Sequence, residues 1–168
     1  MRQARAFTLV EILVVVVLLG ILAAVVIPSV AHSGTAARES ALASDLALLR
    51  RFVLIYKSQH LEVSPGYLNG NTAATPTGAV FVAQATLSSK AGGQTAARGT
   101  ADFNYGPYLS RIPENPLNDK DTVGMVLNGA SFPDDADGIY GWIFKPETGE
   151  IRPDNVGTNG SETAYYDY

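Results

Sequence analysis

A single apolar run, Phe7–Pro28, most strongly limits what this chain can fold into. The 21 residues from Phe7 to Ile27 would reach roughly 30 Å as an α-helix, which matches the hydrocarbon core of a bilayer. No side chain between Ile12 and Ile27 is charged or able to form a hydrogen bond. We therefore expect a transmembrane helix over residues 7–28. Glu11 is its one carboxylate and by default a functional residue, because a charge in a membrane segment is costly.

The distribution of charge gives an orientation and excludes some functions. Arg2 and Arg5 precede the run and predict a cytoplasmic N-terminus, with the body on the other side of the membrane. Residues 1–28 carry a net charge of +1, so the remaining 140 residues carry −5 of the total of −4. An acidic body argues against a nucleic-acid partner. The chain has no cysteine, which excludes disulfides, thiolate metal sites and a cysteine nucleophile.

The basic start and apolar run are also typical of a secretory signal peptide, here with a small-residue cleavage site at Ser29-Val30-Ala31. A secreted domain behind such a signal is therefore one alternative, and a plain signal anchor is another. Neither alternative explains why Glu11 is present, and a signal peptide does not account for the helix-favouring sequence after Ala31.

The residues RAFTLVE at positions 5–11, the apolar run and Pro28 together resemble the N-terminal signature of type IV pilins and type II secretion pseudopilins. In that family the first mature residue is Phe, the fifth is Glu and the twenty-second is Pro, which correspond here to Phe7, Glu11 and Pro28. The resemblance implies a leader peptide of residues 1–6, cleavage by prepilin peptidase between Ala6 and Phe7, and N-methylation of Phe7. Ala6 stands where the family usually has Gly.

The resemblance also implies an assembly. The subunit would wait in the bacterial inner membrane as a single-pass protein with a periplasmic body, and then join a homo-oligomeric helical filament in the periplasm. Its partners would be prepilin peptidase, an inner-membrane assembly platform and minor pseudopilins. We expect Glu11 of one subunit to pair with the Phe7 amine of a neighbour, which offsets the desolvation of both charges. Gly20 and Pro28 match the limits of a segment that can unwind on assembly in this family.

Residues 29–62 are expected to continue as an amphipathic helix. Its apolar stripe recurs at helical spacing through Leu42, Leu46, Leu49, Val53 and Tyr56. Pro28 and Gly34 are the expected places for a bend. His32 and His60 are interpreted as surface or helix-end residues.

Residues 63–168 are expected to form a globular head. Its first part, residues 64–104, is rich in Gly, Ala, Ser and Thr and predicts a variable loop, with a short helix over residues 80–87 that packs Phe81 and Leu87. The segment Tyr105–Asn118 predicts an extended strap that buries Tyr108, Leu109 and Ile112. It resembles a segment of G-type major pseudopilins, through Pro107, Tyr108, Leu109, Arg111, Ile112, Pro113 and Pro116.

The last part of the head contains strand candidates at residues 122–127, 139–145 and 150–152, with a turn at residues 146–149. They predict a small antiparallel sheet against the apolar stripe, and hence an α+β arrangement. The resemblance implies that this fold is type IV pilin-like. Ile139, Trp142 and Phe144 are the expected core anchors. The tail, residues 157–168, shows no clear element.

The acidic cluster Asp134, Asp135 and Asp137 is a candidate calcium site, because hard oxygen ligands suit Ca²⁺ and G-type pseudopilins bind calcium in a C-terminal loop. A solvated acidic turn is the alternative. Catalytic signatures such as GxSxG and HExxH are absent from the sequence, so we expect a protein that is not an enzyme. The strap resembles that of G-type pseudopilins, and the chain lacks the paired cysteines that many pilus subunits carry. Both features favour a structural subunit of a type II secretion pseudopilus. A type IV pilus or DNA-uptake pilin is the alternative.

Overall fold

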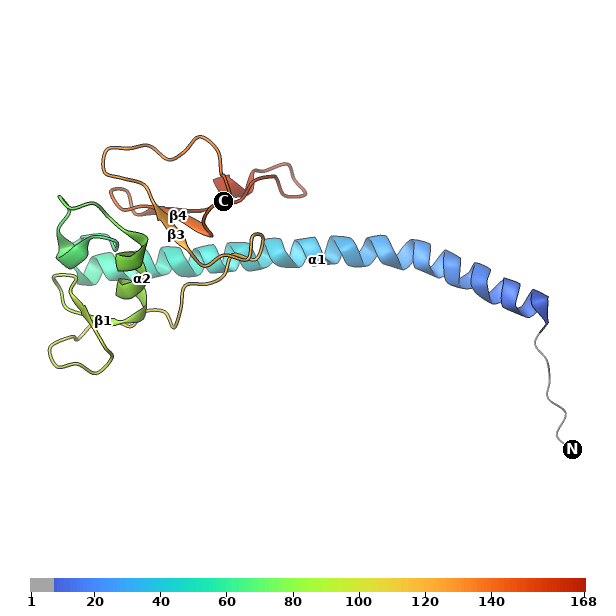
Figure 1. Ribbon diagram of the computed structural model, residues 1–168, viewed down its shortest axis with the longest axis horizontal. Helices are drawn as coiled ribbons and strands as arrows, with labels where there is room; N and C mark the ends of the chain where they lie inside the picture. The colour runs from blue at the N-terminus through green and yellow to red at the C-terminus, as the bar shows by residue number, and fades with distance from the viewer. Residues whose placement is uncertain (1–7) are drawn as a thin grey trace, which may run out of the picture. The chain divides into compact units, whose positions relative to one another are not determined.

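The computed structural model describes the backbone of residues 8–168, and the side chains of that range except those of residues 25–33. The chain divides into two compact units, Met1–Arg38 and Glu39–Tyr168, which are described separately. One helix, α1 (Leu9–Gln59), begins in the first unit and ends in the second (Figure 1). Its backbone is helical through positions 28 and 34, where the sequence favours a bend.

The second unit follows α1 with short elements. These are η1 (Leu68–Gly70), α2 (Gly78–Thr86), β1 (Ser88–Ser89), β2 (Thr95–Ala96), β3 (Val123–Met125), β4 (Trp142–Lys145), β5 (Glu150–Pro153) and η2 (Tyr165–Asp167). Regular structure within residues 64–104 is therefore limited to two short helices and a hairpin whose strands have two residues each.

Helix α2 corresponds to the short helix predicted over residues 80–87. It begins after Thr77, whose hydroxyl accepts a hydrogen bond from the Val80 N–H at 3.3 Å, as an N-cap residue does. Phe81 is fully buried, as predicted. The prediction for Leu87 is wrong: this residue follows the last turn of the helix and is 37% exposed.

The three-stranded sheet has the order β3-β4-β5. Strands β4 and β5 form the predicted hairpin, in which Gly149 has φ +76°, a conformation that glycine adopts without a steric penalty. The pairing of β3 with β4 is parallel, so the expectation of a wholly antiparallel sheet is wrong for this pair. The connection 126–141 returns the chain to the end of the sheet where β3 began, and β4 therefore runs in the same direction.

The core of the second unit forms where the stripe on α1 meets α2 and the sheet, which lie along this part of the helix in Figure 1. All five predicted stripe residues are at most 2% exposed. Phe81 links the layers, because its ring lies 5.3 Å from that of Phe52 and 4.9 Å from that of Phe144. Trp142 and Phe144 are buried as predicted, but Ile139 is 60% exposed because it precedes β4.

The strap Tyr105–Asn118 lies against this core. Leu109 and Ile112 are buried and Tyr108 is half-buried. The indole N–H of Trp142 donates to the Pro113 carbonyl at 2.9 Å. The tail is more ordered than its sequence suggests: Tyr166 in η2 is buried, and the Tyr165 hydroxyl donates to Glu39 on α1 at 2.9 Å.

Candidate functional site

Thr8 and Glu11 form a reciprocal capping box at the start of α1. The backbone N–H and the hydroxyl of Thr8 donate to Glu11 Oε2 at 2.8 and 2.9 Å, and the Glu11 N–H donates to Thr8 Oγ1 at 3.2 Å. The first four N–H groups of a helix have no intrahelical partner, and a capping box satisfies two such donors. The carboxylate also complements the positive end of the helix dipole. Glu11 is thus held over Thr8, the residue next to Phe7.

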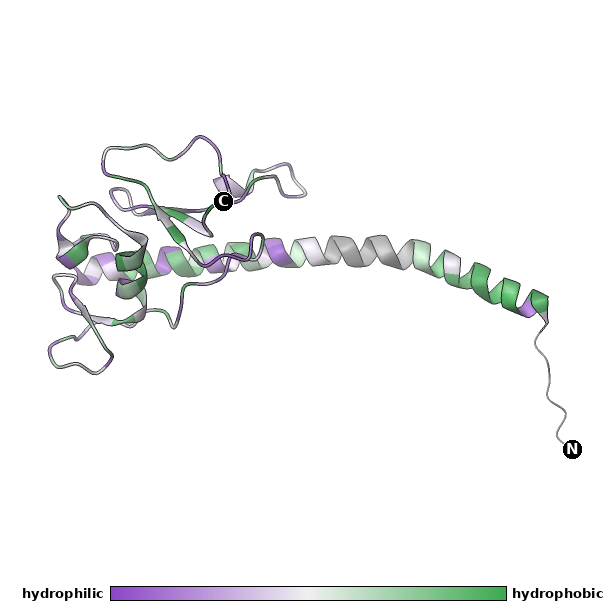
Figure 2. Ribbon diagram, viewed as in Figure 1, coloured by the Kyte–Doolittle hydropathy of each residue, from purple (hydrophilic) through white to green (hydrophobic). Residues whose placement is uncertain are grey.

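The side chains that follow Glu11 form an apolar surface on every side of the helix. Each large apolar side chain between Leu9 and Leu22 is more than 50% exposed. Figure 2 shows the first turns of α1 as hydrophobic apart from one hydrophilic position near the start. A helix that is hydrophobic all round is typical of a segment buried in protein or lipid.

Among the residues whose side chains are described, no helix combines the length and apolarity needed to cross a membrane.

The other residues predicted for processing and assembly are described only in part. Ala6 and Phe7 lie outside the described residues, and so does the side chain of Pro28. Gly20 lies within α1, and a Cβ added there would meet no atom outside its local helix within 4 Å. Packing in the single chain therefore does not demand glycine at this position, and its predicted role in helix flexibility stays a prediction.

The predicted calcium ligands do not form a metal site. Asp134, Asp135 and Asp137 are exposed, and Asp137 Oδ1 accepts from the Ile139 N–H at 2.9 Å. In the part of the chain that the structure describes, no group of three or more His, Asp or Glu side chains could hold a metal ion. The residues present therefore do not fit a calcium ion held by these three carboxylates.

His60 is buried, so its interpretation as a surface residue is wrong, although it does follow the last residue of α1. It is 1% exposed, and its ring stacks on Tyr56 with centroids 3.7 Å apart. Nδ1 lies 2.8 Å from the Tyr56 carbonyl, and Nε2 lies 2.9 Å from the Ser89 hydroxyl. A carbonyl only accepts, so Nδ1 carries the proton and Nε2 accepts from Ser89. Burial lowers the pKa of His60 below its usual value. Through these two hydrogen bonds, the neutral ring connects the end of α1 with β1.

Sequence reasoning missed a buried carboxylate, Asp154, which follows β5 and is fully buried. Its two oxygens accept from the backbone N–H groups of Asp137, Gly138 and Tyr140 at 2.9–3.1 Å. It missed Asn115 as well, which is buried and donates to the Gly141 carbonyl at 2.7 Å. The only hint in the sequence is that Asp154 lies two residues after the strand candidate at residues 150–152.

Comparisons with known proteins bear on both ends of the chain. Residues 1–27 match the family model of the prokaryotic N-terminal methylation motif. The chain is 27% identical over 156 residues to the type II secretion system core protein G of Aeromonas hydrophila, a match that covers 86% of this chain and 96% of the relative. It is 28% identical over 116 residues to the core protein G of Klebsiella pneumoniae, covering 69% of this chain and 71% of that relative. No solved structure matches.

The matched motif covers the start of α1, so the N-terminus of this chain is similar to that of proteins processed and methylated at a prepilin-type site. Both of these relatives are core protein G, which agrees with the resemblance of residues 105–118 to G-type major pseudopilins.

Proposed function

We propose that this chain is a structural subunit of a type II secretion pseudopilus. The observation that carries the proposal is the similarity to core protein G, which extends over 86% of the chain and so includes the head as well as the N-terminal motif. The architecture is consistent with this role, because α1 presents an apolar surface in the first unit and anchors the core in the second.

The proposed mechanism begins with storage in the membrane. Prepilin peptidase removes residues 1–6 and methylates the new amine of Phe7, while the run Phe7–Pro28 holds the subunit in the inner membrane and the head lies in the periplasm. The assembly platform then extracts subunits and stacks them. In the filament, the apolar surface between Leu9 and Leu22 exchanges lipid for the corresponding helices of neighbouring subunits, which keeps it out of water.

Glu11 sets the axial register in this proposal. Its carboxylate already accepts two hydrogen bonds from Thr8 through Oε2, and a carboxylate has lone pairs for further donors on both oxygens. The amine of a neighbour's Phe7 can therefore be added without dismantling the capping box. Only one axial position of the neighbour brings its amine to Glu11, so a misplaced subunit leaves both charges desolvated and unpaired.

We propose a mechanical rather than catalytic role for the head. A hollow of about 730 Å³ lies between α2, β3 and the strap, and its charged lining residues are Arg111 and Asp121. Covalent catalysis requires a nucleophile that a neighbouring group activates, and the lining of this hollow contains no histidine or lysine. His60 is buried and hydrogen-bonded through both ring nitrogens.

A gene deletion in the source bacterium tests the function. We expect loss of extracellular proteins that depend on type II secretion, with restoration by the wild-type chain, while surface pili and DNA uptake remain. Normal secretion together with lost pili or DNA uptake would refute the pseudopilus and favour a type IV pilus or uptake pilin.

A further inference from the structure

The backbone of residues 137–141 is bonded almost completely by the chain itself. The buried Asp154 carboxylate accepts from three of its N–H groups, the Asp137 side chain accepts from the fourth at Ile139, and Thr122 accepts from the fifth at Gly141. This pairing gives every backbone N–H group of a segment without regular secondary structure a partner within the chain.

The carbonyl groups of the same segment are capped by residues of the strap and the chain that follows it. The Lys120 ammonium donates to the Gly138 carbonyl and, at 3.1 Å, to the Ile139 carbonyl. The Asn118 side chain donates to the Tyr140 carbonyl at 2.8 Å. One side chain, the only cation in this network, therefore bridges two successive carbonyl oxygens.

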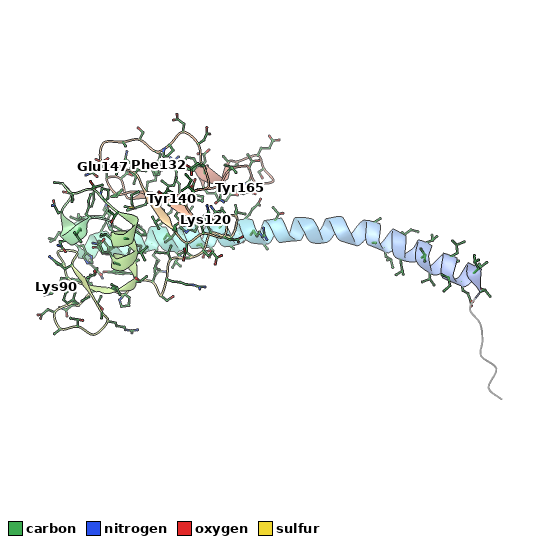
Figure 3. The ribbon with its side chains drawn as sticks, in the orientation of Figure 1. Lys90, Lys120, Phe132, Tyr140, Glu147 and Tyr165 are labelled. Carbon is green, nitrogen blue, oxygen red and sulfur yellow. The ribbon has the colours of Figure 1, made fainter. Side chains whose placement is uncertain are left out.

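The position of Lys120 is fixed by its backbone. Its carbonyl accepts from the Asn115 N–H at 2.9 Å and lies so close to Gly141 that a Cβ at that position would collide with it. Its side chain is half-buried. Figure 3 labels Lys120 and Tyr140 close together, whereas Lys90 lies on the far side of the head in this view.

The chemistry of this arrangement is that of a small cation site. Calcium binds backbone carbonyl and carboxylate oxygens and thereby neutralises an acidic loop. Here the loop carries Asp134, Asp135 and Asp137, but its two adjacent carbonyl oxygens are taken by an ammonium group. An ammonium has three N–H donors and one positive charge, so it can hold two carbonyls and offset part of the acidic charge.

We propose that the Lys120 ammonium group is the cation that orders the 134–141 loop, and that the head of this protein is stable without calcium. Lys120 orders the loop from its carbonyl side, as Asp154 does from its N–H side. The inference rests on the geometry of the head and does not depend on the proposed function.

Thermal melting of the full-length chain in detergent micelles tests the proposal, in excess EGTA and in millimolar calcium. For the wild type we expect the two melting temperatures to agree within about 1 °C. For Lys120→Met we expect a melting temperature about 3–8 °C lower in EGTA, because two charge-assisted hydrogen bonds are lost.

Lys90→Met is the matched control. It removes the same charge from a different part of the head, because Lys90 lies 4.8 Å from the Phe103 ring and caps no loop carbonyl in the hydrogen bonds described. We expect it to melt within about 2 °C of the wild type. Lys120→Arg keeps the cation and should remain folded even if Lys120→Met does not fold.

Two results would overturn the proposal. The first is a rise of several degrees in the wild-type melting temperature on adding calcium, which would mean that the loop still needs a metal. The second is equal melting of Lys120→Met and Lys90→Met, which would mean that Lys120 does not order the loop.

Discussion

Replacing Glu11 by Gln separates two roles of this side chain that Glu11→Ala would remove together. Glu11 accepts two hydrogen bonds from Thr8 in the capping box, and it is proposed to pair with the Phe7 amine of a neighbouring subunit. The Gln side chain has the same length as that of Glu and keeps an acceptor oxygen, and capping boxes contain either Glu or Gln at this position. The substitution therefore removes the charge and preserves the cap.

The two roles have different magnitudes. Loss of a helix cap costs about 0.5–2 kcal/mol, and Glu11→Gln should lose less than that because the acceptor remains. Removing one partner of a buried charge pair costs about 3–5 kcal/mol, which corresponds to a lower tendency to incorporate by roughly 10²-fold to 4 × 10³-fold. We therefore expect Glu11→Gln to be inserted and processed normally and to be nearly absent from filaments.

Thr8→Val is the matched control, because it removes the hydroxyl of the capping box and leaves the carboxylate charged. It should lower incorporation by no more than about 30-fold, the equivalent of the upper value of about 2 kcal/mol for a lost cap. The assay is the fraction of the chain in sheared filaments relative to membranes, measured by quantitative immunoblot in cells that produce the assembly machinery. Wild-type incorporation of Glu11→Gln, or an equal defect in Thr8→Val, would refute the pairing role.

Two further predictions concern the second unit. Phe81→Ala should lower the free energy of unfolding by about 3–5 kcal/mol, because Phe81 is fully buried between Phe52 and Phe144. The control Leu87→Ala should lower it by less than about 1 kcal/mol. Denaturant titrations measure both values, and equal effects of the two substitutions would contradict the packing described. Stability should be constant above about pH 7 and fall as the pH drops below the ordinary histidine pKa of about 6.5, because burial lowers the pKa of His60 and the unfolded chain then binds the proton first. Melting curves should show this decline in wild type but not in His60→Gln, and its persistence in His60→Gln would exclude His60 as the cause.

The features that could be predicted from sequence are those specified by neighbouring residues. The stripe from Leu42 to Tyr56 follows helical spacing, which is a local property, and each of its five predicted residues is buried. The turn at residues 146–149 is likewise encoded by its own Pro and Gly. The capping box of Thr8 and Glu11 also has a local signature, S/T-x-x-E before an apolar run. From the sequence alone we explain Glu11 only by its cost in the membrane and its pairing in the filament, and not as a helix cap.

The features that could not be predicted depend on residues distant in the sequence. The parallel pairing of β3 with β4 is decided by the path of the connection 126–141, which has no periodic pattern. The burial of His60 depends on Ser89, 29 residues away. The loop carboxylates suggested calcium from composition alone, whereas the chain supplies Lys120 and Asp154 from segments on either side of the loop.

The mature N-terminus is the most direct test of the central claim that this is a processed pseudopilin. The chain should be purified from membranes of cells that contain prepilin peptidase, and its N-terminal peptide identified by mass spectrometry. We predict a protein that begins at N-methylated Phe7. A mature start at His32, as a secretory signal peptide would give, or an uncut chain beginning at Met1, would contradict the account.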